Sequence, residues 1–234
     1  MNYAQPNYLT GLKHGIPTAL GYFVVSFTFG MIAHLGGLSS FYALLISMTS
    51  LTSAGQFAGL NIMFASGSIT ELTIAMIVIN SRYSLMATAM SQKLAKGTTL
   101  LQKALMSIFI TDENFAVAMV EVEHITWQYY LGVATLPYIG WSSGTLLGAL
   151  VDNLLSQPMQ NAASIALYCM FIALFIPPAK EQIAIRHVII VTIILGVLLY
   201  YLPLFSPIST GYKIMIAAIL GAIYGAIRYP QEVV

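Results

Sequence analysis

The sequence predicts an all-α, polytopic membrane protein with six to eight membrane segments. Its 234 residues are 58% hydrophobic and only 7% charged, with a mean hydropathy of +0.82. Globular domains carry about 25% charged residues, so this chain has too few charges to cover a soluble surface. Apolar runs of about 20 residues, the length that spans the hydrocarbon core, recur along it. These runs favour a helical bundle, because a membrane barrel would show alternating segments of about ten residues.

Composition and motifs also exclude several classes of function. The net charge of +1 provides no basic footprint for nucleic acid, so we expect no nucleic-acid partner. The only cysteine, Cys169, excludes an intrachain disulfide. The sequence contains no phosphate-binding loop, dinucleotide fingerprint, nucleophile elbow or metal-ligand spacing. We therefore expect a protein that is not an enzyme, that needs no cofactor or metal, and that works in the lipid bilayer.

The apolar segments follow one another without a long linker, which predicts a single integral membrane transporter domain over residues 1–234. The segments are Ile16–Leu35, Phe41–Ala65, Leu72–Leu94, Leu100–Val120, Trp127–Val151, Ala163–Ile176, Ile185–Leu204 and Tyr212–Ile227. We treat each as a helix, with boundaries that can shift by a few residues.

Two of these segments, at about 41–65 and 127–151, are predicted to be discontinuous or re-entrant. The first carries SMTSLTSAGQFAGLN in its middle, where small and hydroxyl residues replace the usual large apolar ones. The second contains Pro137, which removes a backbone donor and bends a helix. It also has glycines at 140, 144 and 148, a spacing that permits close helix packing. Trp141 lies between them, where packing is the simpler role and lining a pocket the alternative. Transporters build their sites from such broken helices.

The basic residues discriminate between two topologies. If all eight segments cross, the Lys and Arg residues other than Arg82 divide four against four, which gives no orientation. If the two unusual segments enter and return from outside, seven of the eight share one side and only Lys213 opposes them. The acidic residues that would then lie opposite the basic side are Glu71, Glu121 and Glu123. The positive-inside rule favours this arrangement, with a cytoplasmic N-terminus. The alternative is eight crossings with inverted three-helix repeats.

Three charged residues lie deep within predicted spans. Arg82 falls about midway along one span, and Asp112 and Glu113 about midway along the next. A short loop joins these spans, so they are expected to be antiparallel neighbours with the three side chains at similar depth. Charges at the bilayer centre are costly and usually pair or face a cavity. Because successive helical residues point about 100° apart, we expect one carboxylate to pair with Arg82 and the other to face a cavity and serve proton coupling. A purely structural ion pair is the alternative.

Other polar residues near these charges extend the candidate site. Over the uninterrupted helix expected at 100–120, Ser107, Thr111 and Asn114 form one polar stripe. The side-chain amides of Gln56, Asn61 and Asn80 either contact substrate or satisfy the backbone of a broken helix. The candidates for substrate binding or coupling are Gly55, Gln56, Asn61, Asn80, Arg82, Thr111, Asp112, Glu113 and Asn114.

Four stretches together resemble the AzlC family, the large subunits of branched-chain amino acid exporters. They are GIPTALGYFVVSFTFGMIAHLGGLS (15–39), TSAGQFAGL (52–60), INSRYSL (79–85) and FITDENFAV (109–117). The resemblance extends over most of the chain and is clearest over 15–120, where the order and spacing of the stretches carry it. Many family members have His after the arginine, whereas this chain has Tyr83. A proton relay through that histidine is therefore not available here.

The resemblance implies export of valine, leucine and isoleucine, with methionine as a further candidate. It also implies a small AzlD-type membrane subunit as partner and a location in the bacterial cytoplasmic (inner) membrane. An amino acid zwitterion needs a cation or a helix N-terminus for its carboxylate, and acceptors for its ammonium group. Arg82, a broken-helix N-terminus near Gly55 and Gln56, and Asp112 or Glu113 are suited to these roles.

Three other functions remain open from the sequence. A passive channel or facilitator for a small solute is the main alternative, because hydroxyl-rich broken segments also suit a pore. A membrane hydrolase with paired carboxylates is a second, and a structural subunit whose partner holds the site is a third. Concentration of a substrate against its gradient distinguishes a coupled exporter from a channel.

Overall fold

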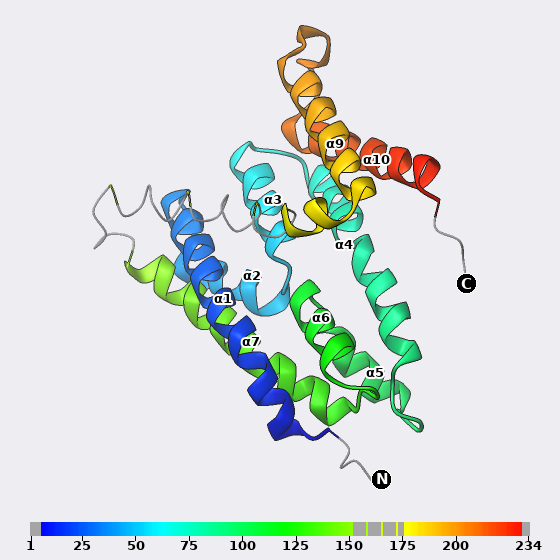
Figure 1. Cartoon of the computed structure of the whole chain (residues 1–234). Coiled ribbons are helices and arrows are strands. Elements are labelled where there is room, and N and C mark those ends of the chain that lie inside the picture. The colour runs from blue at the N-terminus through cyan, green and yellow to red at the C-terminus, as the bar shows by residue number, and fades with distance from the viewer. Residues whose placement is uncertain (1–5, 152–157, 159–164, 166–171, 173–175, 231–234) are drawn as a thin grey trace. The chain divides into compact units, whose positions relative to one another are not determined.

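The computed structural model is built from α-helices over the residues that it describes, which are 6–151, 158, 165, 172 and 176–230 (Figure 1). The elements are α1 (Tyr8–Leu35), α2 (Ser40–Thr49), α3 (Ser53–Phe64), α4 (Ile69–Gln92), α5 (Leu100–Ser107), α6 (Asp112–Glu121), α7 (Trp127–Val151), α9 (Ile183–Tyr201), the short 3₁₀ turn η2 (Pro203–Phe205) and α10 (Thr210–Arg228). Most of the predicted segment Ala163–Ile176 lies outside the described residues.

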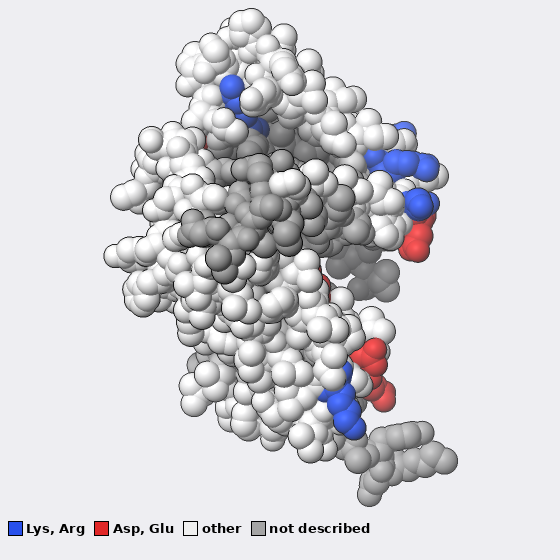
Figure 2. Space-filling model, turned by 90° about the vertical axis from the view of Figure 1, so that its left-hand side faces the viewer, with Lys and Arg blue, Asp and Glu red and all other residues white. Residues whose placement is uncertain are grey.

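The fold is that of a polytopic helical membrane protein, as predicted. Among the described helices, α1, α4, α9 and α10 are each long and apolar enough to cross a membrane. Figure 2 shows that few of the side chains visible on this face belong to Lys, Arg, Asp or Glu. Such a surface suits contact with lipid rather than water.

The chain divides into two compact units. The first unit comprises residues 1–57 and 79–166, and the second comprises 58–78 and 167–234. The division passes through α3 and α4, so each unit contains part of both helices.

Helices α1 and α7 form the scaffold of the first unit and run parallel, side by side (Figure 1). Near their starts, the Thr126 hydroxyl donates to the Pro6 carbonyl at 2.7 Å. Farther along, the glycines of α7 lie against the backbone of α1, and a Cβ atom at Gly144 would collide with the Phe23 carbonyl oxygen. Gly140 and Gly148 make similar approaches to α1, which confirms that their spacing serves close packing. We call the end at Pro6 and Thr126 the starting end.

Helices α2 and α3 form a re-entrant hairpin, as predicted for residues 41–65. The α2 helix runs back along the second half of α7, since the Ser40 hydroxyl donates to the Ala149 carbonyl at 3.1 Å and Tyr138 of α7 bonds to the Met48 carbonyl at 3.1 Å. The helix breaks at residues 50–52, near the middle of α7. After the break, α3 turns back, so that Phe57 packs edge-on against Phe29 at 5.5 Å between ring centres. This hairpin therefore enters from the end opposite the starting end.

The segment at 100–120 is a second hairpin, and the prediction of one uninterrupted helix there was wrong. The α5 helix ends at Ser107, and α6 begins at Asp112. Thr111 has extended dihedral angles (φ −135°, ψ 166°) and its hydroxyl accepts from the backbone N–H of Asn114, so it caps a new helix. The carbonyl of Phe109, freed by the break, accepts from the side chains of Asn114 and Tyr130, both at 3.1 Å. The polar stripe expected through Ser107 consequently does not form.

The second hairpin enters from the starting end. Glu121 is the last residue of α6, and its Oε2 lies 3.8 Å from Nδ1 of His14 in α1. Lys93, which follows α4, donates to the carbonyls of Met119 and Val122 at 2.7 and 3.0 Å. The two hairpins thus enter the first unit from opposite ends, which is the inverted arrangement known from transporters.

Helix α7 is continuous from Trp127 to Val151, so the prediction of a discontinuous element at 127–151 was also wrong. Pro137 leaves the carbonyl of Val133 without its helical partner. Gly15 of α1 lies directly against that carbonyl. Close packing by a neighbouring helix lets a membrane helix keep an internal proline.

The charges at the starting end depart from one further expectation. Lys93 and Lys13 belong to the same end, as the positive-inside argument required. Glu121 lies there as well, beside His14, rather than opposite the basic residues. The reason is that residues 100–121 return to their own side instead of crossing.

The second unit has its own small core. Ile62, Ala75 and Met215 are buried together. Glu71 in the first turn of α4 is only 4% exposed and accepts a hydrogen bond from Ser209 at the start of α10. Helices α9 and α10 pack directly, with Gly221 against the Thr192 side chain.

Candidate functional site

The tips of the two hairpins meet at a small cavity inside the first unit. Its lining residues come from α1, the α2–α3 break, α4, the α5–α6 break and α7, and are Tyr22, Leu51, Ser53, Tyr83, Thr111, Asp112, Glu113 and Trp141. The cavity has a volume of about 10 Å³, which is about the space that one water molecule requires. Both α3 and α6 begin here, so the positive ends of two helix dipoles face the cavity from opposite hairpins.

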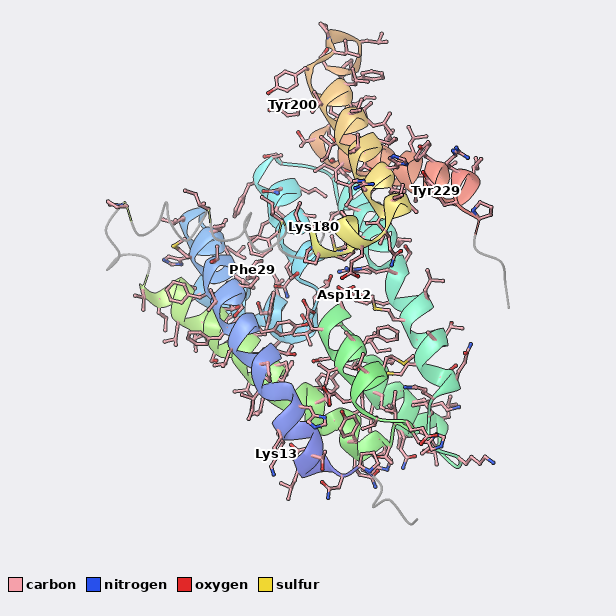
Figure 3. The ribbon with its side chains drawn as sticks, in the orientation of Figure 1. Lys13, Phe29, Asp112, Lys180, Tyr200 and Tyr229 are labelled. Carbon is pink, nitrogen blue, oxygen red and sulfur yellow. The ribbon has the colours of Figure 1, made fainter. Side chains whose placement is uncertain are left out.

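Asp112 is held by Arg82 at the edge of this cavity. The Nη1 atom of Arg82 lies 2.6 Å from Oδ2 of Asp112, and Figure 3 shows Asp112 at the start of α6. Nη2 of Arg82 donates to the Tyr83 hydroxyl at 3.3 Å, and the guanidinium carbon lies 5.0 Å from the centre of that ring. Within the described part of the chain, Nε of Arg82 is buried without a hydrogen-bond partner. The predicted pairing of Arg82 with one carboxylate is therefore present.

Glu113 makes a separate interaction with the scaffold helix. The Tyr22 hydroxyl donates to Oε2 of Glu113 at 2.6 Å, a length typical of a hydrogen bond to a charged acceptor. Tyr22 itself is 7% exposed and its ring packs edge-on against Trp141 at 5.1 Å. The two adjacent carboxylates consequently have different partners on different helices, which agrees with the 100° separation expected for neighbouring helical residues.

Gln56 supports the cavity from behind rather than lining it. Its Oε1 accepts from Nε1 of Trp141 at 3.2 Å and from the Ser47 hydroxyl at 3.4 Å. Its Nε2 donates to the carbonyls of Ser50 and Ile46, which also accept from the backbone N–H groups of Thr52 and Ser50 respectively. These contacts place Gln56 at the helix break and against α7, and its role in transport stays a prediction.

The amide of Asn80 has a similar supporting position. The Thr52 hydroxyl donates to Oδ1 of Asn80 at 2.9 Å, which ties the first break to α4. A Cβ atom at Gly55 would collide with the Thr52 side chain and approach Oδ1 of Asn80 at 3.4 Å. Glycine is therefore needed at 55 for the start of α3 to pack against this pair.

The remaining candidates divide between the cavity and its surroundings. Thr111 lines the cavity along with the two carboxylates, whereas Asn114 is fully buried and stabilises the α5–α6 break. Asn61 is exposed on the part of α3 that belongs to the second unit, and it is not among the residues that line this cavity. The roles of all these residues in transport stay predictions.

Sequence reasoning missed Tyr22, Leu51, Ser53 and Tyr83 as cavity residues. Tyr22 is separated from Glu113 by 91 positions, so no local pattern could connect them. A usable signal was nonetheless present, because a tyrosine in the middle of a predicted span needs a partner for its hydroxyl. Trp141 lines the cavity and also packs, so both roles considered for it apply.

The chain matches the family model described as AzlC protein over residues 17–155, a range that includes every residue lining the cavity. It is 30% identical over 181 residues to an uncharacterized membrane protein of Archaeoglobus fulgidus, covering 76% of this chain and 77% of the relative. It is 26% identical over 172 residues to the inner membrane protein YgaZ of Escherichia coli K12, covering 72% and 70%. An uncharacterized membrane protein of Helicobacter pylori 26695 is 26% identical over 171 residues, covering 72% and 74%. No solved structure matches the chain.

Proposed function

The chain belongs to the AzlC family, and from this premise we propose that it is a secondary exporter of branched-chain amino acids. Family membership and its membrane-protein relatives support a role in membrane transport. The cavity supports the more specific proposal of a zwitterionic substrate. Valine, leucine and isoleucine are the proposed substrates, with methionine as a further candidate.

The observation that carries the proposal is the meeting of two oppositely directed hairpin tips at one acidic cavity. Secondary transporters place substrate and coupling ions where discontinuous helices expose backbone groups and helix ends. Here Ser53 begins one such helix and Asp112 the other, and both line the cavity. Irregular backbone at membrane depth is tolerated only where it is buried in protein or lines a cavity. Two helix breaks at one cavity are therefore typical of a functional site.

A zwitterion finds complementary groups at these tips. Glu113 provides an acceptor for the ammonium group, in competition with the Tyr22 hydroxyl. Arg82 and the start of α3 at Ser53 provide positive charge for the carboxylate, in competition with Asp112. The ring of Trp141 and the side chain of Leu51 supply apolar wall for an aliphatic side chain. Binding of the substrate therefore replaces two internal interactions of the protein, Tyr22 with Glu113 and Arg82 with Asp112, by interactions with the ammonium and carboxylate groups of the substrate.

The closed cavity favours a carrier over a channel. With room for about one water molecule, it must open before an amino acid can enter. A carrier opens toward one side at a time, whereas a channel needs a continuous path. Opening requires the interaction of Glu113 with α1, or that of Asp112 with α4, to break.

The orientation and partner belong to the same proposal. Lys13, Lys93 and Lys96 gather at the starting end, which the positive-inside rule assigns to the cytoplasm. The N-terminus is then cytoplasmic, and the membrane is the bacterial inner membrane, as for the relative YgaZ. A small AzlD-type membrane subunit completes the exporter, and gradients of ions drive it.

The test is efflux of valine, isoleucine and methionine from preloaded cells, with this chain expressed alone and with an AzlD-type subunit. Glu113→Gln removes one of the two cavity carboxylates, and Glu123→Gln makes the same chemical change at an exposed position. A hydrogen bond to a charged group contributes about 1.5–3 kcal/mol, so we expect an efflux loss of roughly 10- to 100-fold for Glu113→Gln. Glu123→Gln should export normally.

The outcomes separate the competing functions. Efflux against a gradient that needs both subunits and Glu113 supports the exporter. Flux that equilibrates but never concentrates an amino acid would instead identify a facilitator. Absence of amino acid flux from a well-assembled pair would show that the substrate class is wrong.

A further inference from the structure

A second pocket lies at the starting end of the first unit, separate from the cavity between the hairpin tips. It has a volume of about 210 Å³ and lies between the loop after α4 and the start of α7. Its lining residues are Ala95, Lys96, Gly97, Thr98, Gln102, Thr126, Trp127 and Gln128. The role proposed for the hairpin tips uses none of them.

The walls of this pocket are held by a network of backbone hydrogen bonds. The N–H of Ala95 donates to the Ile125 carbonyl, and the N–H of Ile125 donates to the Lys93 carbonyl, both at 2.9 Å. These bonds join the loop after α4 to the segment before α7. The loop turns at Gly97, whose φ of +87° favours glycine. The pocket is therefore a built part of the first unit rather than a gap beside a loose loop.

Three side chains that line the pocket, Lys96, Gln102 and Trp127, have hydrogen-bond donors available, whereas the hydroxyls of Thr98 and Thr126 already donate to the carbonyls of Ala95 and Pro6. Lys96 carries an ammonium group and Trp127 an indole N–H, and neither group can accept a hydrogen bond. The Oε1 of Gln102 already accepts from the Thr99 N–H at 2.9 Å, which leaves its NH₂ group as the available donor. No Asp or Glu is among the lining residues. This set of groups favours an anion.

The position of the pocket indicates where the anion comes from. Trp127 begins a long helix of the membrane scaffold, and tryptophan is enriched where such helices meet the lipid headgroups. Leu100 and Leu101, which follow the pocket loop at the start of α5, are 83% and 71% exposed. Exposed leucines beside a polar pocket are suited to an acyl chain below a bound headgroup.

We propose that this pocket binds the phosphate group of an anionic phospholipid, with Lys96 and Trp127 contacting the headgroup and Leu100 and Leu101 contacting its acyl chain. A soluble phosphate would present the same anionic oxygens to Lys96 but would make no use of the leucines. If the ligand is a phospholipid, its affinity for the pocket therefore depends on both its headgroup and its acyl chain.

Trp127 makes the proposal testable by fluorescence quenching. The full chain, with Trp141→Phe so that Trp127 is the remaining tryptophan, is reconstituted in phosphatidylcholine nanodiscs. Brominated phosphatidylglycerol or brominated phosphatidylcholine is then added at increasing mole fraction. We expect phosphatidylglycerol to quench at several-fold lower mole fraction. The wild-type chain gives a parallel readout, the rise in its unfolding temperature on addition of each lipid, which does not depend on the Trp141 substitution.

Lys96→Gln should reduce the preference for phosphatidylglycerol by roughly fivefold, the effect of one basic residue near an anionic surface. The matched control is Lys103→Gln, because Lys103 follows the same loop but does not line the pocket. Equal quenching by the two lipids, or equal loss of preference in both variants, would overturn the proposal. Protection by glycerol phosphate in detergent without any preference among lipids would also overturn it, since the source would then be a soluble anion.

Discussion

The ion pair between Arg82 and Asp112 allows a prediction that separates a structural role from a transport role. Asp112→Asn removes the negative partner and keeps the shape of the side chain. The guanidinium of Arg82 would then retain the Tyr83 hydroxyl at 3.3 Å and the face of that ring, while its buried Nε has no partner among the described residues. A positive charge would be left at membrane depth with little compensation.

The magnitude follows from the burial of the pair. Removing one partner of a fully buried ion pair costs about 3–5 kcal/mol, whereas an exposed pair contributes about 0.2–1 kcal/mol. The Arg82 and Asp112 side chains are 35% and 27% exposed, between these limits. We therefore expect each single variant, Arg82→Gln or Asp112→Asn, to lose about 2 kcal/mol of stability. The double variant removes both charges and should recover most of that loss, because no unpaired charge remains.

Thermal unfolding in detergent and amino acid efflux are measured on the same four proteins. If the pair also binds substrate, the double variant regains stability but stays deficient in efflux by roughly 30-fold, the rate equivalent of about 2 kcal/mol. Full recovery of efflux in the double variant would show that the pair is only structural. Additive losses of stability, without coupling, would refute the ion pair itself. Full export by Asp112→Asn at normal abundance would remove Asp112 from the mechanism.

Three further predictions concern the scaffold. Lys93→Met should destabilise the chain by about 1–2 kcal/mol in thermal unfolding, because it removes the ammonium that caps the last carbonyls of α6, whereas Lys96→Met should not. Gly144→Ala should lower the unfolding temperature and the yield of folded protein, since its Cβ collides with the backbone of α1, whereas Gly196→Ala, in open space, should be neutral or stabilising. Glu71→Gln should lower the free energy of unfolding by about 1–2 kcal/mol and speed hydrogen exchange at the start of α10. The buried Glu71 carboxylate accepts a hydrogen bond from Ser209, the residue just before that helix. Unchanged exchange would contradict this role.

The errors in the predicted fold have a common physical cause. Pro137 and the glycines of α7 are strong local signals for a break, yet the packing of α1 against α7 keeps the helix continuous. The stretch FITDEN contains neither proline nor glycine, yet the helix breaks there. Its signal was the order of the polar residues, because a threonine followed by two acidic residues is typical of a helix N-terminus. Proline and glycine content alone therefore predicted the second break in 127–151, whereas it lies between Ser107 and Asp112.

The candidate site was predicted unevenly for a related reason. Arg82, Asp112 and Glu113 were identifiable because charge in an apolar span requires a partner or a cavity. Gln56 and Asn80 were correctly placed near a broken helix, but only the structure shows their partners, which are the carbonyl of Ser50 for Gln56 and the hydroxyl of Thr52 for Asn80. The cavity residues contributed by distant helices, such as Tyr22, could not be assigned from spacing.

By itself, the sequence determined that this chain is a helical membrane protein, that its residues 41–65 cannot form a simple span, and that its deep charges must be satisfied internally. These properties follow from composition and from the cost of polar groups in hydrocarbon, which act on each segment separately. Only the tertiary structure decided which of the other segments breaks, and that Asp112 faces Arg82 while Glu113 faces Tyr22. Those choices depend on which helix lies alongside, because a broken helix is stable only where neighbouring side chains satisfy its freed backbone groups.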